Sequence, residues 1–475
     1  MVQTGIVASY MILTVLIGIW SQKRVADSRK YDGMGLGVLM CVVAGAGEWL
    51  GGTSTVGVAE YGYEYGISGA WYTIANAAGV CVLAVFFAKL YRSMEVTTVS
   101  GIVGAYIGEQ ARVWSAALQI VVLIAIGTSQ MIAAGSVGES VFHLESTESI
   151  LFLGLIVLLY TVSGGMMAVA YTNIIHMLVM YGGILLAALL CYRALPEGVD
   201  SMTQVLPASY FAMSGIGYGK ISSWLTASVL GACAAQAGLQ PILGSKDTRT
   251  AVRSSWLIAL IVAPFGILTA FLGMIAKVLY PDLENAKMAL PVLLTQLPAA
   301  AGGLVMAAII AAVLSTASPI FLSCGTLFTR DIFRLLKKDA LRQEGPEELR
   351  VSRLVTLICG CLCMALAILL RSSSRALDIV YFAYSIRGSL FVILLMGIYW
   401  RNITQTGAVL AMAATGLVSF FWIFYKNQTG TYPVSAGFSE TYAAVLTSVL
   451  VTLFVSLILK RKKEEDKGEK TDDRE

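Results

Sequence analysis

The residues best suited to bind a ligand stand inside an apolar stretch, residues 42–55, with the sequence VVAGAGEWLGGTST. A carboxylate (Glu48), an indole (Trp49) and the hydroxyls of Thr53 and Ser54 lie among four glycines. Because glycine favours open backbone conformations, a continuous helix is not expected here. In a bilayer, an interrupted helix is tolerated only where protein or a watery cavity satisfies the freed backbone groups. The stretch therefore predicts a binding site in a transporter core. Close helix packing through glycine is the alternative, but packing alone does not require Glu48.

A second charge, Arg387, lies in a later apolar stretch. Glu48 and Arg387 are the oppositely charged residues that we place near mid-membrane. A charge at that depth costs roughly 2.5–3.5 kcal/mol on insertion scales unless it is paired or hydrated. We predict that both side chains face a central cavity, where they either pair or hold the ammonium and the carboxylate of a zwitterionic solute; the planar fork of arginine suits the carboxylate. There are two alternatives to a role in solute binding. The two residues form a static structural pair, or Arg387 only adds positive charge near an ion path.

Three polar residues in other apolar stretches are further candidates. Gln130 lies in the middle of residues 113–141, and Gln236 lies in a run rich in glycine and alanine, residues 230–241. Each amide either hydrogen-bonds a polar solute or bridges neighbouring helices. His176 either carries protons or bridges helices, and we favour bridging.

Composition places the whole chain in a membrane. Its 475 residues are 57% hydrophobic and 13% charged, with a mean hydropathy of +0.76. Apolar runs of about 20 residues recur from end to end, which predicts an all-α polytopic membrane protein. The net charge of +4 does not indicate a nucleic-acid partner, because the basic residues fall between the apolar runs. No nucleophile–base pair, phosphate-binding loop or metal-ligand spacing stands out, so we expect neither an enzyme nor a cofactor, and we expect the eight cysteines to pack as small apolar residues.

About thirteen membrane spans are predicted, two of which are interrupted. The interrupted spans, 35–58 and 223–243, would be the first and sixth helices of a ten-helix core, as an inverted five-plus-five repeat predicts. The longest span, 290–331, is expected to contain a bend or an extension outside the membrane. The predicted spans are 4–22, 35–58, 68–90, 113–141, 148–163, 165–192, 223–243, 252–279, 290–331, 351–371, 377–399, 404–425 and 440–459.

The distribution of basic residues predicts the orientation. Cytoplasmic loops carry an excess of lysine and arginine, which places the N-terminus outside and the C-terminus in the cytoplasm. The predicted cytoplasmic groups are Lys23, Arg24, Arg29 and Lys30; Lys89, Arg92 and Arg112; Lys246, Arg249 and Arg253; Arg330, Arg334, Lys337, Lys338 and Arg342; Arg401; and Lys460, Arg461, Lys462 and Lys463. We divide the chain into an extra N-terminal helix and loop (1–34), two core halves (35–222 and 223–403), two C-terminal helices (404–459) and a disordered tail (460–475).

Four motifs, in order and at suitable separations, resemble those of the sodium:solute symporter family, which has a LeuT-type core. The resemblance covers nearly the whole chain. The stretch from Trp49 to Gly52, with Ala59-Glu60 and residues 86–89, is most similar to the choline-transporter branch. The motifs are GGMMAVAYTN (164–173), similar to G-G-x-x-A-V-x-[WY]-T-D; AVLSTAS (312–318) followed by TLFTRDI (326–332), similar to A-x-x-S-[ST] and T-R-D-[IL]; QPILGSKD (240–247), similar to Q-R-x-x-[AS]-x-[KS]; and Gly57, Tyr63 and Gly66 at the end of the first core helix.

The resemblance implies a sodium site between the first and eighth core helices. Sodium is a hard cation that suits neutral oxygen ligands, and an unwound helix exposes carbonyls that would otherwise be committed. Asn173 stands where the family usually has aspartate, and it is assigned a role in coupling. The implied sodium ligands are the backbone carbonyls of Gly47, Leu50 and Ala312 and the side chains of Ser315 and Thr316.

Two further departures from the family pattern concern the solute. Pro241 stands where arginine is usual, and Ala235 stands where the choline branch has an aromatic residue. A cage that holds a quaternary ammonium by cation–π attraction would therefore lack one wall beside Trp49.

These observations predict a secondary active transporter. We expect a sodium-coupled symporter that imports a small polar organic solute, such as an amino-acid-like zwitterion or an amine, by alternating access. Its partners would be the solute, sodium and the lipid bilayer of the plasma membrane. One alternative is a proton-coupled or sodium-independent transporter of the same fold, which Asn173 and His176 suggest. The other is a membrane sensor. The oligomeric state and the identity of the solute stay open.

Overall fold

The structure is a computed structural model that describes residues 2–22, 31–195, 198–295, 297–336, 346–371, 376–435 and 437–472. These residues form helices joined by turns, with one isolated β-bridge between Leu36 and Ser245. The helices, in chain order, are α1 (Val2–Gln22), α3 (Val38–Trp49), η1 (Thr53–Gly57), α4 (Val58–Tyr65), η2 (Gly66–Ala70), α5 (Trp71–Val82), η3 (Leu83–Phe87), α6 (Ala88–Ser93), α7 (Val99–Tyr106), α8 (Glu109–Phe142), α9 (Ser146–Arg193), α10 (Val199–Val205), η4 (Ala208–Phe211), α11 (Tyr218–Ala232), α12 (Gln236–Leu243), α13 (Thr248–Leu279), η5 (Ala286–Met288), α14 (Ala289–Thr295), α15 (Ala299–Leu327), η6 (Phe328–Phe333), α16 (Arg334–Leu336), α17 (Pro346–Leu370), α18 (Ala376–Tyr399), α19 (Gln405–Thr429) and α20 (Glu440–Asp472).

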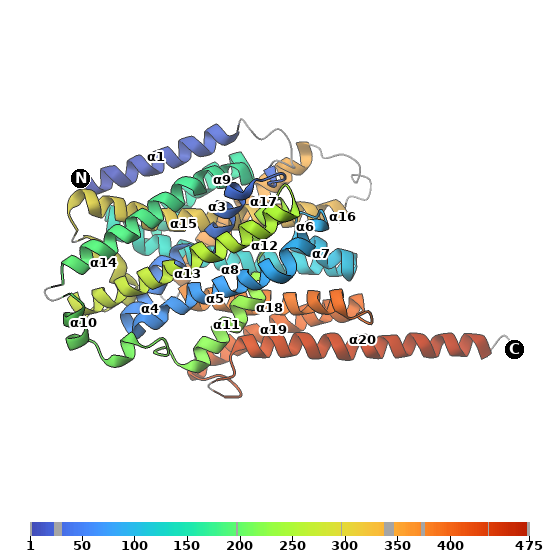
Figure 1. The fold of residues 1–475 in the computed structure, drawn as a ribbon. Helices are drawn as coiled ribbons and strands as arrows, with labels where there is room; N and C mark the ends of the chain where they lie inside the picture. Colours follow the sequence, from blue (N-terminus) through green and yellow to red (C-terminus); the bar gives the residue numbers. More distant parts are fainter. Residues whose placement is uncertain are drawn as a thin grey trace.

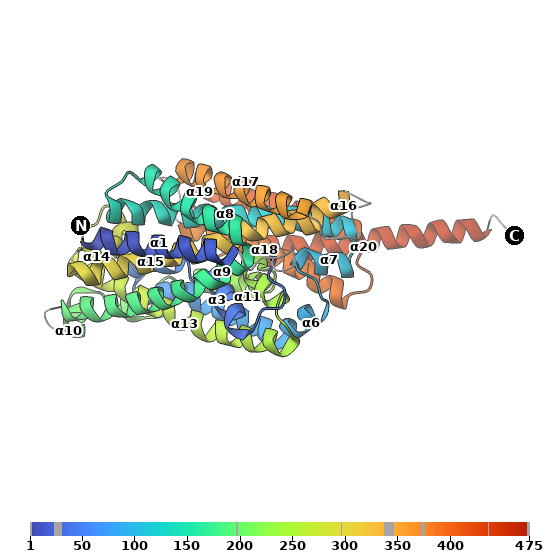
Figure 2. The ribbon, with the colours of Figure 1, turned by 90° about the horizontal axis from the view of Figure 1, so that it is seen from above.

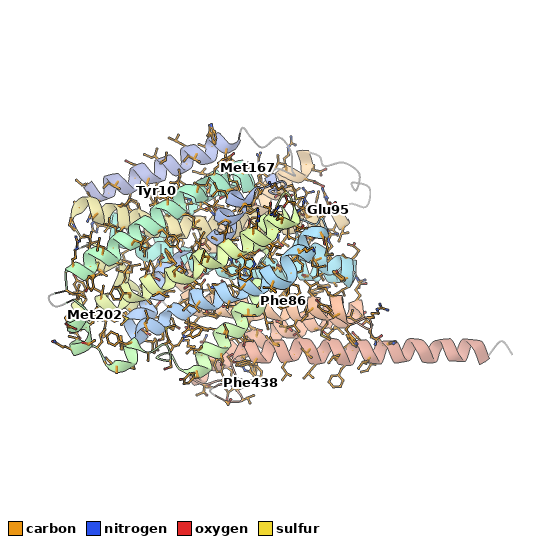
Figure 3. The ribbon with its side chains drawn as sticks, viewed as in Figure 1. Tyr10, Phe86, Glu95, Met167, Met202 and Phe438 are labelled. Carbon is orange, nitrogen blue, oxygen red and sulfur yellow. The ribbon has the colours of Figure 1, made fainter. Side chains whose placement is uncertain are left out.

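The long helices form one bundle with side chains filling the space between them (Figures 1 and 3). The start of α1 and the end of α20 lie at opposite ends of this bundle in two perpendicular views (Figures 1 and 2). Helix α15 packs against α9, α8, α1 and α17, and every residue from Val305 to Leu327 is buried. This central helix therefore forms a fixed wall for any site built beside it.

Ten helical runs in the described part of the chain are long and apolar enough to cross a membrane. They confirm the all-α polytopic fold, but they do not confirm the number of thirteen spans. Two of the ten runs, Thr53–Ser93 and Ser146–Arg193, each take in parts of more than one predicted span. Helix α3 has only 12 residues, and α11 and α12 have 15 and 8, so none of the three reaches the length of a full span.

Both predicted interruptions are present. The first helix of the core stops after Trp49 and resumes at η1, with Leu50 in a non-helical conformation (φ −108°, ψ 61°). The sixth stops after Ala232 and resumes at Gln236. Because both breaks fall in runs of glycine and alanine, the local sequence accounts for where the helices end.

A third discontinuity lies between the predicted spans 148–163 and 165–192. The hydrogen-bonded helix α9 runs through both, but Gly165 adopts φ 56° and ψ −147°, which redirects the chain. A Cβ atom at this position would lie 2.4 Å from the ring of Tyr31. Gly165 is therefore required both by its positive φ and by the close approach of Tyr31.

The long predicted span 290–331 contains a break, as expected from its length. Helix α14 ends at Thr295 and α15 begins at Ala299, and Pro298 restricts the backbone between them.

One sequence-based expectation differs from the structure. The tail predicted to be disordered from residue 460 continues α20 as a helix to Asp472. Lysine and glutamate are good helix formers, so a charged continuation of an established helix is physically reasonable. Several of the basic residues used to predict orientation, at positions 23–30 and 337–345, lie outside the described residues.

Candidate functional site

The break after α3 exposes backbone groups that nearby polar side chains satisfy. Ser54 Oγ donates to the carbonyl of Gly51 at 2.7 Å, and Thr55 Oγ1 donates to the carbonyls of Gly51 and Gly52, each at 3.2 Å. The amide of Gly52 donates to Gln130 Oε1 at 2.8 Å. An interruption inside a membrane protein is stable only with such partners. The hydroxyl of Ser54, predicted to contact solute, is thus engaged in holding the break.

The five implied sodium ligands come together where α3 crosses α15. Thr316 Oγ1 donates a short hydrogen bond to the carbonyl of Gly47. Ser315 Oγ lies 3.3 Å from the carbonyl of Leu50 and 2.9 Å from that of Ala312. All five residues are buried, and their oxygens are neutral. Such a cluster of hard neutral oxygens suits a sodium ion.

Asn173 lies beside this cluster. Its Nδ2 donates to the carbonyls of Val43 at 3.2 Å and Ser315 at 3.4 Å, so it joins α9 to both α3 and α15. Its Oδ1 is buried without a hydrogen-bond partner. A buried acceptor in this state is costly, and a cation would satisfy it. Its unpartnered oxygen could therefore accept a contact from a cation bound at this cluster.

Two glycines give the cluster its close packing. A Cβ at Gly47 would lie 2.4 Å from Asn173 Nδ2 and 2.7 Å from the carbonyl oxygen of Ser315. A Cβ at Gly51 would lie 2.4 Å from Thr316 Oγ1 and 2.5 Å from Gln130 Oε1. The backbone at the break approaches its neighbours this closely only because these positions lack side chains.

Glu48 and Arg387 form a direct ion pair. Arg387 Nη2 donates to Glu48 Oε1 at 2.8 Å, and the two residues are 1% and 2% exposed. The remaining atoms of each group, Glu48 Oε2 and Arg387 Nη1, are buried without hydrogen-bond partners. The guanidinium carbon also lies 5.0 Å from the centroid of the Tyr384 ring. Each charged group therefore keeps one unsatisfied polar atom.

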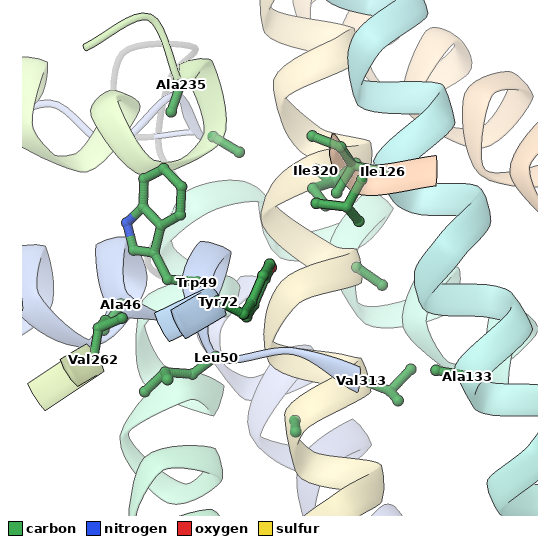
Figure 4. Close-up of a cluster of buried hydrophobic side chains, with 14 of the residues drawn as sticks. Ala46, Trp49, Leu50, Tyr72, Ile126, Ala133, Ala235, Val262, Val313 and Ile320 are labelled. Atoms are coloured by element: carbon green, nitrogen blue, oxygen red, sulfur yellow. The ribbon is translucent and has the colours of Figure 1, made fainter. Parts of the chain in front are cut away.

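Aromatic side chains surround the pair. The ring of Trp49 is edge-on to Tyr384 at 6.2 Å, and it projects toward the turn that holds Ala235 (Figure 4). Tyr72 OH lies 3.0 Å from Thr53 Oγ1 and 3.5 Å from Tyr384 OH. Thr53 and the aromatic rings thus line the same buried region as the ion pair. Sequence reasoning does not single out Tyr72, whereas the spacing of Tyr384 three residues before Arg387 places both on one helix face.

Gln130 lies in this region, whereas the hydrogen bonds of Gln236 lead to other parts of the chain. Gln130 Nε2 lies 3.4 Å from Thr53 Oγ1, in addition to its bond with Gly52. Gln236 Oε1 instead accepts from the amide of Val99 at 2.8 Å, at the start of α7. The structure thus gives Gln236 the helix-bridging role that was the alternative to solute contact.

His176 also bridges helices. Its Nδ1 is hydrogen-bonded to Tyr10 OH, which ties α1 to α9. Its Nε2 is buried without a partner. The bridging role favoured from the sequence agrees with these contacts.

Ion pairs of Arg330 and Asp331, in η6, connect the end of α15 to neighbouring segments. Arg330 pairs with Asp32 at 2.6 Å, and Asp331 pairs with Arg112 at 2.7 Å. Arg330 also lies 3.6 Å from Glu348. The T-R-D motif therefore joins the end of α15 to the segment before α3, to α8 and to α17.

Comparison with known proteins identifies the family. The model of the sodium:solute symporter family matches residues 32–415. In Bacillus subtilis (strain 168), the uncharacterized symporter YwcA is 25% identical over 431 residues, covering 86% of this chain and 82% of that protein. The osmoregulated proline transporter OpuE of the same organism is 24% identical over 482 residues, covering 95% and 94%.

Solved structures share the fold. A substrate-bound, outward-open Na⁺-coupled sialic acid symporter has a TM-score of 0.76 at 17% identity, covering 96% of this chain and 98% of that one. MhsT in complex with L-phenylalanine has a TM-score of 0.57 at 13% identity, covering 89% and 99%. The family match extends over most of the chain, from the segment before α3 into α19. The protein is therefore a member of the sodium:solute symporter family, a sodium-coupled secondary transporter of a small solute and not an enzyme.

Proposed function

We propose that the solute is an amino-acid-like zwitterion, held between Glu48 and Arg387. The observation that carries this proposal is the pair of unsatisfied atoms, Glu48 Oε2 and Arg387 Nη1, in a buried site. A solute ammonium would bond to the carboxylate oxygen, and a solute carboxylate would bond to the guanidinium. Such a ligand supplies the two hydrogen bonds that the protein by itself leaves unmade.

Aromatic faces would hold the rest of the solute. Trp49, Tyr72 and Tyr384 offer apolar ring surface next to the ion pair. An ammonium group is also attracted to the face of an aromatic ring. We infer that these rings, together with the hydroxyl of Thr53, set the size and shape of the solute.

Sodium would bind between α3 and α15 through Gly47, Leu50, Ala312, Ser315 and Thr316. In the structure the two hydroxyls donate to carbonyls of the cluster. On binding, these hydroxyls would rotate so that their lone pairs, with the carbonyls, face the cation. Asn173 lies beside this cluster, and the partial negative charge on its Oδ1 would also attract the cation.

The arrangement explains how ion and solute would be coupled. Gly47 and Leu50 offer carbonyls to sodium, while Glu48 and Trp49, between them in sequence, face the solute. Ordering this short non-helical segment for one ligand would order it for the other, which produces a favourable coupling free energy between the two sites. Alternating access would then follow from rocking of the helices around this fixed segment.

The names of relatives support this class of solute. OpuE is named as a proline transporter, and MhsT was solved with L-phenylalanine. Proline and phenylalanine are both zwitterions at neutral pH. We therefore take L-proline as the first probe.

Uptake of radiolabelled L-proline into proteoliposomes tests the proposal. An inward sodium gradient is compared with an inward proton gradient and with no gradient. We expect sodium-driven accumulation, and we expect L-alanine, which has both an ammonium and a carboxylate, to compete better than choline or acetate. A thermal-shift screen over amino acids, sugars, carboxylates and quaternary amines, with and without sodium, extends the probe set because ligands stabilise the folded state by mass action. Stabilisation by sugars alone would contradict the zwitterion assignment.

We further propose that the N-terminus faces outward and the C-terminus faces the cytoplasm of the plasma membrane. The two ends of the bundle are opposite, and the predicted charge bias favours this orientation. Protease accessibility of terminal tags in intact cells measures it. Cleavage of a C-terminal tag from outside would reverse the assignment.

A further inference from the structure

A groove runs along the outside of the bundle between the first half of α9 and helix α17. It has a volume of about 320 Å³. Three exposed leucines, Leu155, Leu159 and Leu357, line it. Below them the helices meet closely, because a Cβ atom at Gly360 would lie 2.4 Å from Leu158 Cδ2. Both helical runs are long and apolar enough to cross a membrane, so this lipid groove opens toward the acyl chains of the bilayer.

Arg353 of α17 lies at one end of the lipid groove. Its Nη2 donates to the carbonyl of Ser163 at 3.0 Å, and Ser163 follows Val162 at the end of the α9 wall. Its guanidinium carbon lies 5.8 Å from the centroid of the Tyr31 ring. Side chains on a helix lean toward its N-terminus, so Arg353 reaches toward the start of α17. In the orientation proposed above, this is the cytoplasmic end, where the headgroups of the inner leaflet lie.

The charge of Arg353 has no counter-ion in the part of the chain that the structure describes. No carboxylate oxygen there lies within 4 Å of its nitrogens, and its Nε is buried without a hydrogen-bond partner. Arg334, near the same end of the bundle, instead pairs with Glu348 at 2.6 Å. The exposed Arg350 lies one turn before Arg353 and adds a second positive charge to that face of α17. Since an ionised side chain beside lipid is costly unless it is paired or hydrated, this end of the lipid groove is suited to an anionic group.

The arginine and the apolar groove together fit an anionic phospholipid. The planar fork of arginine matches the oxygens of a phosphate. Basic pockets between transmembrane helices on the cytoplasmic side bind anionic headgroups. The α9 wall rises about 12 Å from Ser163 back to Leu155, so an acyl chain that leaves the phosphate can lie along the leucines. A free phosphate would use the arginine alone, and a zwitterionic lipid brings its own ammonium and therefore neutralises Arg353 less fully.

We propose that the lipid groove holds one anionic phospholipid of the inner leaflet. Its phosphate lies against the guanidinium of Arg353, and one acyl chain lies along Leu155, Leu159 and Leu357. The lipid joins α9 to α17 on their outer side, where the two helices leave a gap between their exposed leucines. The site is separate from the solute and sodium sites and does not depend on the proposed function; only the choice of leaflet rests on the proposed orientation.

Retention of phosphatidylglycerol by the purified full chain tests the proposal. The protein is reconstituted in vesicles of phosphatidylethanolamine and phosphatidylglycerol and extracted with detergent, and the lipids that stay bound are counted by native mass spectrometry. We expect one phosphatidylglycerol per chain, and Arg353→Gln should bind it about tenfold or more weakly, since a charge-assisted hydrogen bond is lost. The matched control, Arg253→Gln, changes an exposed arginine of α13 that precedes the exposed Trp256 and Leu257, and it should bind as the wild type does.

A second pair of variants keeps the arginine, in case Arg353→Gln fails to fold. Leu159→Trp fills the lipid groove from an exposed position and should also weaken the binding of phosphatidylglycerol. Leu260→Trp, at an exposed position of α13, is its control and should leave binding unchanged. Thermal unfolding gives an independent readout, because a bound lipid stabilises the folded state by mass action. Phosphatidylglycerol should raise the melting temperature of the wild type more than that of Leu159→Trp.

Three results would overturn the site. Equal retention of phosphatidylglycerol by the wild type, Arg353→Gln and Leu159→Trp would mean that only unspecific lipid surrounds the helices. Equal retention of phosphatidylethanolamine and phosphatidylglycerol would remove the assignment to an anionic lipid. A dimer that dissociates in Leu159→Trp without loss of bound lipid would assign the groove to a second copy of the chain. These measurements use neither solute nor sodium, so their failure leaves the proposed function intact.

Discussion

Removing either partner of the Glu48–Arg387 pair alone should destabilise the protein strongly. Removing both should cost less than the sum of the two single losses. With the charged atoms 2.8 Å apart and an effective dielectric constant of about 20, Coulomb's law gives an attraction of about 6 kcal/mol. Desolvation offsets much of this attraction, so the net value of the pair is smaller. A single Glu48→Gln or Arg387→Gln substitution leaves one buried charge alone, and we expect each to lower the free energy of unfolding by about 3–5 kcal/mol.

A double-mutant cycle separates the interaction from the cost of each substitution. The double variant should lose less stability than the two single losses added together, with a coupling of at least about 2 kcal/mol. Reversible unfolding in a mixed detergent titration supplies the four free energies. A comparison is the pair of Glu109 and Arg112, which lie 3.7 Å apart with the glutamate side chain 63% exposed. Because Arg112 also pairs with Asp331, only the coupling free energy of this cycle is compared, not the loss in the single Arg112 variant. The coupling of Glu109 and Arg112 should stay below about 1 kcal/mol.

The result that would refute the reasoning is additivity. A coupling below about 0.5 kcal/mol for Glu48 and Arg387 would mean that water or a rearranged neighbour shields the two charges from each other. Arg387→Lys separates structure from recognition. The lysine keeps the charge but loses the planar fork, so we expect a folded protein with weakened zwitterion binding. Unchanged L-proline affinity in that variant would remove Arg387 from the solute site.

Three further predictions follow from the sodium cluster. Ser315→Ala and Thr316→Ala should each raise the sodium concentration needed for half-maximal uptake by about tenfold or more, because each removes a ligand oxygen, while unfolding changes less; an unaltered sodium dependence would contradict the ligand assignment. Asn173→Asp adds a negative charge beside the cluster and should alter sodium affinity or the pH profile of uptake, and an identical profile would count against a role near the ion. Gly51→Ala should lower the free energy of unfolding by about 1–3 kcal/mol, because its Cβ would lie 2.4 Å from the Thr316 hydroxyl oxygen. Gly182→Ala is the control: no atom lies within 4 Å of its Cβ, so thermal unfolding should show a neutral or stabilising effect.

Much of the fold could be predicted because its main features are local. The interruption near Leu50, the interruption near Ala235 and the turn at Gly165 all occur at glycine- or alanine-rich positions, and backbone preferences act over a few residues. Apolar length likewise predicts where helices can cross a bilayer. The number of spans was less predictable. Some helical runs continue through two predicted spans, and a broken helix divides one span into two short helices.

The candidate site could be predicted only in part. Motif resemblance placed Ser315, Thr316 and Asn173 near one another, and in the structure all three hydrogen-bond to α3 or to Leu50 directly after it. Gln130 and Gln236 are both polar residues in apolar surroundings, and the sequence favoured Gln236 as the solute contact because it lies at the second interruption. Only the packing of α8 and α12 separates them: one amide caps the break, and the other reaches the start of α7.

The amino-acid sequence by itself determined the class of protein, the breaks in two helices and the presence of opposite charges in the membrane. It could not determine that Glu48 and Arg387 touch, because 339 positions separate them and their contact depends on how α3 and α18 pack. The same holds for a cavity of about 180 Å³ that is lined by Lys220, Asp378 and Glu440, which come from α11, α18 and α20. Local preferences set where helices start and stop, whereas the pairing of distant side chains arises only when the tertiary structure fixes the distances between them.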